Sequence, residues 1–242
     1  MDESPALGSR EALALALATH GLRLRGGFVP DADDQLPELP GGQRVAVVWM
    51  VGQVGAECWR HFAASPFLRD GLANPMDLWS RSIGEKLAAP LAGHVLMPSD
   101  GPPWYPFQQW ALRIGEGLQP TPLQLQLHPL FGLWHAWRFA LALPHITPDD
   151  APRLPAVAAG IPSDICARCD GQPCLSACRV QAFTRTGFDA AACRTHVASE
   201  QGSDCLAQGC RARRACPVGA EQRYEAAQAA FHVAAFEGGK QP

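Results

Sequence analysis

The sequence predicts an α+β protein whose last third is a small, mostly helical, cysteine-rich domain. Two observations carry this prediction. Short apolar strands alternate with amphipathic helices in the first part of the chain, and eight of the nine cysteines fall between Cys166 and Cys216. The 242 residues are 47% hydrophobic and 18% charged, which is enough to build a packed core and excludes global disorder. We expect an α+β domain over residues 1–150 and the cysteine-rich domain over residues 160–238.

The expected helices follow from apolar periodicity and from capping residues. Asn74 followed by Pro75 is a favourable helix start, and Gly21 and Gly117 are typical stops. The predicted helices cover residues 1–20, 58–64, 74–89, 107–116 and 221–236.

The expected strands are short. The run Val45–Val51 is apolar throughout and lies between glycines, and His94–Met97 is a second apolar run. Leu123–Leu127 alternates leucine with glutamine, which is the period of a half-buried strand. Together with Trp134–Leu143 it predicts an antiparallel hairpin. Residues 144–160 are rich in Pro, Asp and Ala and predict a linker.

Charge and hydropathy exclude several classes of function. The net charge of −3 argues against broad nucleic-acid binding. The chain contains no uninterrupted apolar run long enough to cross a membrane. Its first residues are acidic and do not resemble a secretory signal peptide. We therefore expect a cytoplasmic protein that acts away from membranes.

The cysteines predict a metal centre. Without an export signal a disulfide scaffold is not expected, and dense cysteines in a reducing compartment are typical of metal ligands. Cys58 stands apart from the others and predicts a buried apolar residue.

Eight thiolates divide into two sets of four, the number that a [4Fe-4S] cluster requires. In two-cluster ferredoxins the fourth cysteine of each run binds the other cluster. That pattern assigns Cys166, Cys169, Cys174 and Cys216 to one cluster, and Cys178, Cys193, Cys205 and Cys210 to the other. The spacing departs from the bacterial run, because four residues separate Cys169 from Cys174 and Arg179 replaces the proline. Zinc, which also binds four thiolates, is the alternative.

The order of the eight cysteines resembles the C-terminal part of epoxyqueuosine reductase, a cobalamin-dependent tRNA-modifying enzyme, and of reductive dehalogenases. The segment His128–Arg138 (HPLFGLWHAWR) resembles the HPxFGxWxAxR segment of the cblC-type cobalamin-processing protein. Asn74–Asp77 (NPMD) resembles a helix start of the same protein. The resemblance implies a nitroreductase-like N-terminal domain that holds a corrinoid, followed by a ferredoxin-like domain with two clusters.

The resemblance implies roles for three further residues. Asp100 matches the proposed proton donor of the reductase family, and its alternative role is that of a turn former before Gly101. Arg138 matches a pocket arginine of the cobalamin-processing protein, or else it lies on the polar face of a strand. His128 faces the corrinoid, or else it is a turn residue.

The expected function is therefore that of an iron–sulfur redox protein. Two [4Fe-4S] clusters would pass single electrons from an external donor, of the flavodoxin or ferredoxin-reductase type, to a cobalamin or small-molecule site in the N-terminal domain. Whether the chain is an enzyme stays open. The alternatives are a ferredoxin-like carrier without catalysis and a zinc-stabilised interaction module.

Overall fold

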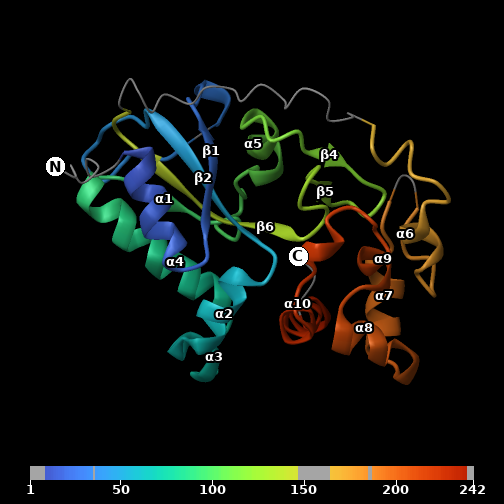
Figure 1. The fold of residues 1–242 in the computed structure, drawn as a ribbon. Coiled ribbons are helices and arrows are strands. Elements are labelled where there is room, and N and C mark those ends of the chain that lie inside the picture. Colours follow the sequence, from blue (N-terminus) through green and yellow to red (C-terminus); the bar gives the residue numbers. More distant parts are fainter. Residues whose placement is uncertain (1–8, 35, 147–163, 185–186, 239–242) are drawn as a thin grey trace. The chain divides into compact units, whose positions relative to one another are not determined.

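The computed structural model describes residues 9–34, 36–146, 164–184 and 187–238 (Figure 1). The chain forms two compact units. The first combines residues 1–116 with 136–159, and the second combines residues 117–135 with 160–242. The expected linker, residues 144–160, lies largely outside the described residues. The expected domain ranges, 1–150 and 160–238, stay a prediction. Contacts within the chain group residues 117–135 with the second unit.

The first unit is built on a four-stranded sheet with the strand order β1-β2-β6-β3. The strands are β1 (Arg23–Phe28), β2 (Val47–Val54), β3 (His94–Leu96) and β6 (His135–Leu143). β1 and β2 are antiparallel and so are β3 and β6, with a bulge at Leu24/Gly26. Every residue of β2 is buried, as expected for an inner strand that is covered on both faces.

The helices of the first unit accompany this sheet (Figure 1). They are α1 (Arg10–Ala18), α2 (Glu57–Ala64), α3 (Pro66–Arg69), α4 (Pro75–Ala88) and α5 (Phe107–Arg113), with 3₁₀ turns at Ala32–Asp34 and Ala89–Leu91. α1 begins at Ser9, whose side chain accepts a hydrogen bond from the Ala12 N–H.

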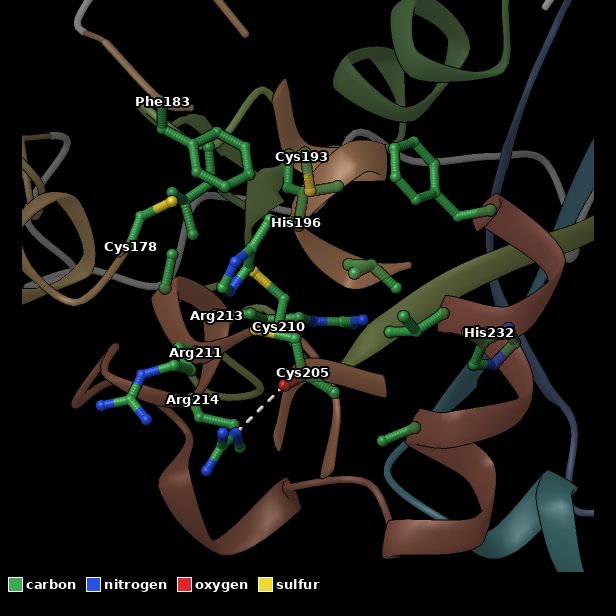
Figure 2. Close-up of a pocket in the computed structure, with 18 of the residues that line it drawn as sticks. Cys178, Phe183, Cys193, His196, Cys205, Cys210, Arg211, Arg213, Arg214 and His232 are labelled. Atoms are coloured by element: carbon green, nitrogen blue, oxygen red, sulfur yellow. Dashed lines mark hydrogen bonds between the residues drawn. The ribbon is translucent and has the colours of Figure 1, made fainter. Parts of the chain in front are cut away.

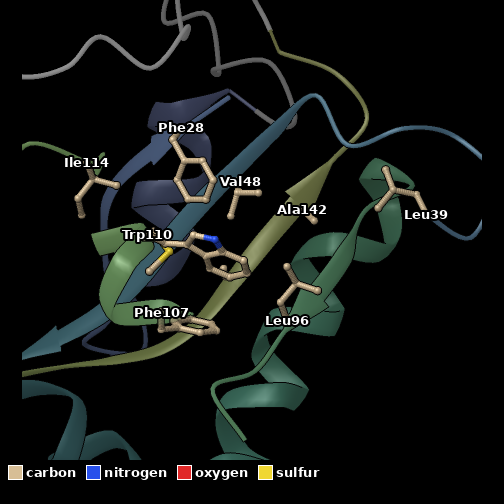
Figure 3. Close-up of a cluster of buried hydrophobic side chains, with 10 residues drawn as sticks. Phe28, Leu39, Val48, Leu96, Phe107, Trp110, Ile114 and Ala142 are labelled. Atoms are coloured by element: carbon tan, nitrogen blue, oxygen red, sulfur yellow. The ribbon is translucent and has the colours of Figure 1, made fainter. Parts of the chain in front are cut away.

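The core of the first unit combines residues of the sheet and α5. Trp110 of α5 lies among side chains of β1, β2, β3 and β6, which Figure 3 shows around Phe28, Val48 and Leu96. The indole of Trp110 is 1% exposed, and its Nε1 donates to the Asp34 carboxylate at 2.9 Å. The one polar atom of this large buried ring is therefore satisfied.

The second unit is mostly helical. Its helices are α6 (Pro173–Ser176), α7 (Ala190–Val197), α8 (Ser203–Gln208), α9 (Arg211–Arg214) and α10 (Ala226–Gly238), with 3₁₀ turns at Glu200–Gly202 and Ala220–Gln222. β4 (Gln119–Pro120) and β5 (Gln126–Leu127) form a small antiparallel pair. α7 is capped by Asp189, whose side chain accepts from the Ala192 N–H.

The mixed α+β class is confirmed, and so are most of the expected elements. Helices lie at 57–64, 75–88, 107–113 and 226–238, and strands lie at 47–54, 94–96 and 135–143. The expected hairpin is wrong, because only Gln126–Leu127 of the alternating segment is a strand and it pairs with Gln119–Pro120. β6 instead lies between β2 and β3. In the described part of the chain, none of the helices is long and apolar enough to span a bilayer.

Candidate functional site

The second unit contains a cavity of about 410 Å³ that four cysteines line. These are Cys178, Cys193, Cys205 and Cys210, and Figure 2 shows their side chains around one space. They reach the cavity from separate elements. Cys178 follows α6, Cys193 lies on α7, Cys205 lies on α8, and Cys210 directly precedes α9.

A second, smaller space of about 30 Å³ lies in the same unit. Its lining includes Cys166, Cys169, Cys174 and Cys216 together with Leu127. The structure therefore brings the eight cysteines together as two groups of four, with the membership that their spacing predicts. Their role as metal ligands stays a prediction.

Burial raises the pKa of five of these thiols. It raises the pKa of Cys193 to about 11, with the neighbouring thiols Cys210, Cys178 and Cys205 adding to the shift. Burial likewise raises the pKa values of Cys210, Cys166, Cys174 and Cys216. The thiolate, not the thiol, is the nucleophile and the metal ligand. In this arrangement these five thiols are protonated at neutral pH.

The expected iron–sulfur function is wrong by this structure. Within the described residues, no three or more His, Cys, Asp or Glu side chains are placed so that they could hold a metal ion. The four thiols of the larger space line about 410 Å³, and the described residues do not gather three of them closely enough to hold one ion. The same finding overturns the ferredoxin-like carrier and the zinc-stabilised module.

The cavity also carries polar groups that the cysteine pattern does not reveal. The Nε1 of Trp134, the Nε2 of His196 and the Nε of Arg211 are buried and have no hydrogen-bond partner among the described residues. All three residues line the cavity. His196 lies one helical turn after Cys193 on α7, and this spacing is the one sequence signal that could have identified it.

Arginines on the cavity wall are held in place by the second unit itself. Arg211 and Arg214 donate to the Asp204 carboxylate at 3.0 and 2.5 Å. These pairs lower the pKa of Asp204, although its desolvation opposes them. The Arg213 guanidinium lies 4.8 Å from the Trp134 ring centroid and 4.5 Å from that of Tyr224. Cation–π contacts of this kind fix the position of a charge without neutralising it.

Asp100 lies in the first unit, in the turn that follows β3. Its carboxylate accepts a hydrogen bond from the Met97 N–H at 3.0 Å and pairs with the Arg81 guanidinium. The side chain is 31% exposed, so the carboxylate is within reach of solvent. Its expected role as a proton donor stays a prediction.

His128 is a buried residue of the second unit. Its Nδ1 accepts hydrogen bonds from the backbone N–H groups of Leu130 and Phe131 at 3.0 and 3.1 Å. Its ring stacks on that of Phe131, with centroids 4.0 Å apart. These contacts hold the turn that precedes β6, and no observation tests the alternative role of His128 at a corrinoid.

Arg138 lies on β6 in the first unit. Its Nε is buried and makes no hydrogen bond within the described part of the chain. The guanidinium is close enough to Cys58 to oppose, in part, the burial that raises the pKa of this thiol to about 12. Cys58 itself is fully buried on α2. Arg138 is therefore a half-buried cation whose Nε is a donor that the described residues leave unused.

Comparisons with known proteins were made with both the sequence and the structure. No family model and no curated protein matches the chain. Among solved structures, the chain is similar to the B12-trafficking protein CblC of C. elegans, described as a homologue of human MMACHC. The match has a TM-score of 0.48 and 14% identity over 91% of this chain and 88% of that one. A likeness of this size fixes neither the fold nor the function of this chain, and the proposals below rest on its own residues.

Proposed function

We propose that this chain is a corrinoid-binding protein, and that its first unit has a nitroreductase-like fold in which Arg138 contacts the corrinoid. The proposal has two supports. One is the resemblance of the segment His128–Arg138 to a cobalamin-processing protein. The other is the unused Nε donor of Arg138 at the end of that segment, and this second observation carries the proposal.

The chemistry of the ligand fits this donor. Cobalamin carries amide side chains and a phosphodiester around its ring, and all of them present oxygen acceptors. A buried Nε–H without an acceptor is costly, because an unsatisfied donor loses about 1–3 kcal/mol of hydrogen bonding to water. A ligand oxygen at Arg138 would remove that cost, and arginine binds phosphate and carbonyl oxygens with fixed geometry.

The chain's other residues have supporting roles in this proposal. His128 holds the turn that leads into β6, because its Nδ1 accepts hydrogen bonds from two backbone N–H groups of that turn. Asp100 provides an acidic group that Arg81 and the Met97 N–H hold in place. A bound corrinoid would supply reductive or group-transfer chemistry, and we assign no particular reaction. A cytoplasmic location stays part of the proposal.

A cobalamin titration tests this function. Aquacobalamin added to the full chain should shift its visible spectrum and bind with one-to-one stoichiometry. Arg138→Ala should weaken binding about tenfold or more, the effect of a lost charged hydrogen bond. Arg138→Lys, which keeps the charge but loses the planar donor group, should recover part of the affinity.

The matched control is Arg10→Ala. Arg10 is exposed on α1, so its removal changes the net charge by the same amount and should leave the affinity unchanged. Thermal unfolding of each variant shows that the fold is intact. If neither aquacobalamin nor its reduced form changes its spectrum or co-elutes with the wild-type chain, the proposal is wrong.

A further inference from the structure

The larger cavity of the second unit has walls that suit an apolar ligand. Phe183 and Phe188 stack with centroids 4.6 Å apart, and Phe236 lies 6.1 Å from Phe188. All three rings line the cavity, together with Val233 of α10. The volume of about 410 Å³ falls within the range of small-molecule sites.

Two polar groups of this cavity require an acceptor. Trp134 is 3% exposed and lines the cavity, and its Nε1–H has no acceptor among the described residues. An indole N–H can only donate, so the missing partner must be an acceptor. The Nε of Arg211 is a second buried donor on the same wall without a partner in the described chain.

The charge of the walls points to an anion. Arg179, Arg211, Arg213 and Arg214 line the cavity, and no acidic side chain of the described residues does. Arg211 and Arg214 share the single carboxylate of Asp204, so one of these two positive charges remains in excess. Arg213 has two aromatic rings and the Leu133 carbonyl as neighbours, none of which carries a charge. Figure 2 shows Arg211, Arg213 and Arg214 together with the cysteines.

We propose that this cavity binds a small aromatic anion, a carboxylate whose oxygen accepts from Trp134 Nε1 and whose ring packs among Phe183, Phe188 and Phe236. The site lies in the second unit and shares no residue with Arg138. It is therefore independent of the corrinoid proposal, and either one can fail without the other.

The experiment uses the full chain, kept reduced with a phosphine, and equilibrium dialysis with two probes of the same shape. 1-Naphthoate carries the carboxylate, and 1-methylnaphthalene does not. We expect 1-naphthoate to bind one-to-one and at least tenfold more tightly than 1-methylnaphthalene. Trp134→Phe keeps an aromatic ring but removes the N–H. It should weaken naphthoate binding about five- to tenfold, the size of one hydrogen bond, and leave 1-methylnaphthalene unchanged.

The matched control is Trp104→Phe, the same substitution at an indole that is 56% exposed in the first unit. It should change neither affinity, and Arg138→Ala should not change them either. If Trp134→Phe does not fold, Arg211→Gln tests the same wall by removing its second donor. Equal affinity for the two probes, no binding of naphthoate, or unchanged affinity in the Trp134 and Arg211 variants would overturn the proposal. Iron or zinc measured in the wild-type sample at one or more equivalents, and lost in Cys205→Ser, would overturn it too. The thiols would then already hold a metal.

Discussion

The two units differ in where buried polar groups lack partners. In the first unit, Arg25 pairs with Glu116, and Arg113 pairs with Asp34 at 2.7 Å. In the second unit, the cavity-lining Trp134, His196 and Arg211 each present a buried nitrogen that finds no partner within the described residues. Paired groups hold a fold together, whereas unpaired groups beside an open space are typical of a binding site. The comparison assigns a structural role to the Asp34 network and a binding role to the thiol-lined cavity. Among the described residues of the first unit, Arg138 Nε and Ser80 Oγ are exceptions.

The largest expected effect concerns the paired groups of the first unit. Asp34 is buried and accepts from Trp110 Nε1, Arg113 Nη1 and the Asp31 N–H, so Asp34→Ala leaves several donors without an acceptor. We expect the free energy of unfolding to fall by about 3 kcal/mol, as when one partner of a buried pair is removed. Urea unfolding measures this change. Asp33→Ala, at the exposed neighbour, is the control and should cost less than about 0.5 kcal/mol. Similar losses in both variants would contradict the structural role of the network.

The next largest effect concerns the packing at the end of α7 in the second unit. A Cβ added at Gly202 would lie 1.9 Å from the His196 carbonyl oxygen, so Gly202→Ala must displace the end of α7. Overpacking of this kind costs about 1–3 kcal/mol. We expect a loss near 2 kcal/mol by urea unfolding and weaker naphthoate binding, because His196 lines the cavity. Gly187→Ala, where the nearest atom would be 3.8 Å away, is the control. An unchanged stability in Gly202→Ala would show that α7 is not held as described.

A smaller effect follows from the thiols of the second unit. The pKa of Cys193 rises from 9.0 to about 11 on folding, because burial disfavours the thiolate. The unfolded chain therefore loses its proton first as the pH rises. The contribution of Cys193 to the free energy of unfolding is therefore fully present below pH 9 and is lost between pH 9 and 11. Urea midpoints at pH 8 and pH 10.5 should show a fall that Cys193→Ser reduces. An identical fall in the wild-type and Cys193→Ser chains would contradict this burial.

The smallest effect is expected for an ion pair at the surface. Arg23 and Glu57 are 3.4 Å apart, with side chains 46% and 53% exposed. Solvent screening leaves such pairs worth about 0–1 kcal/mol. Glu57→Gln should therefore change the free energy of unfolding by less than about 0.5 kcal/mol, as measured by urea unfolding in low salt. A loss as large as that of Asp34→Ala would erase the distinction between buried and exposed pairs in this unit.

The sequence predicts those elements whose pattern is local. β2 begins with the apolar run Val47–Val51, and α4 begins at Pro75 directly after Asn74, so both were predictable. β1 was missed, because RLRGGF contains two glycines and two arginines and is a strand only by pairing with β2. The expected hairpin failed for the same reason, since the partner of Gln126–Leu127 is decided by tertiary contacts.

In the candidate site, too, features that depend on local sequence were predictable and features that depend on tertiary packing were not. The cysteines that line the two spaces are the same two sets of four that the ferredoxin pattern assigns, and their role as metal ligands stays a prediction. The unpaired nitrogens of Trp134, His196 and Arg138 could not be predicted, because a missing partner is a property of the packed structure. The spacing also gave a wrong function, since it counts ligands but does not say whether they close on a metal.

The most direct test of the account is the affinity of the full chain for aquacobalamin, compared between Arg138→Ala and Arg10→Ala. The account predicts a tenfold or greater loss for Arg138→Ala and none for Arg10→Ala, with both variants folded. Equal affinities in the two variants, or no binding by the wild-type chain, would contradict it.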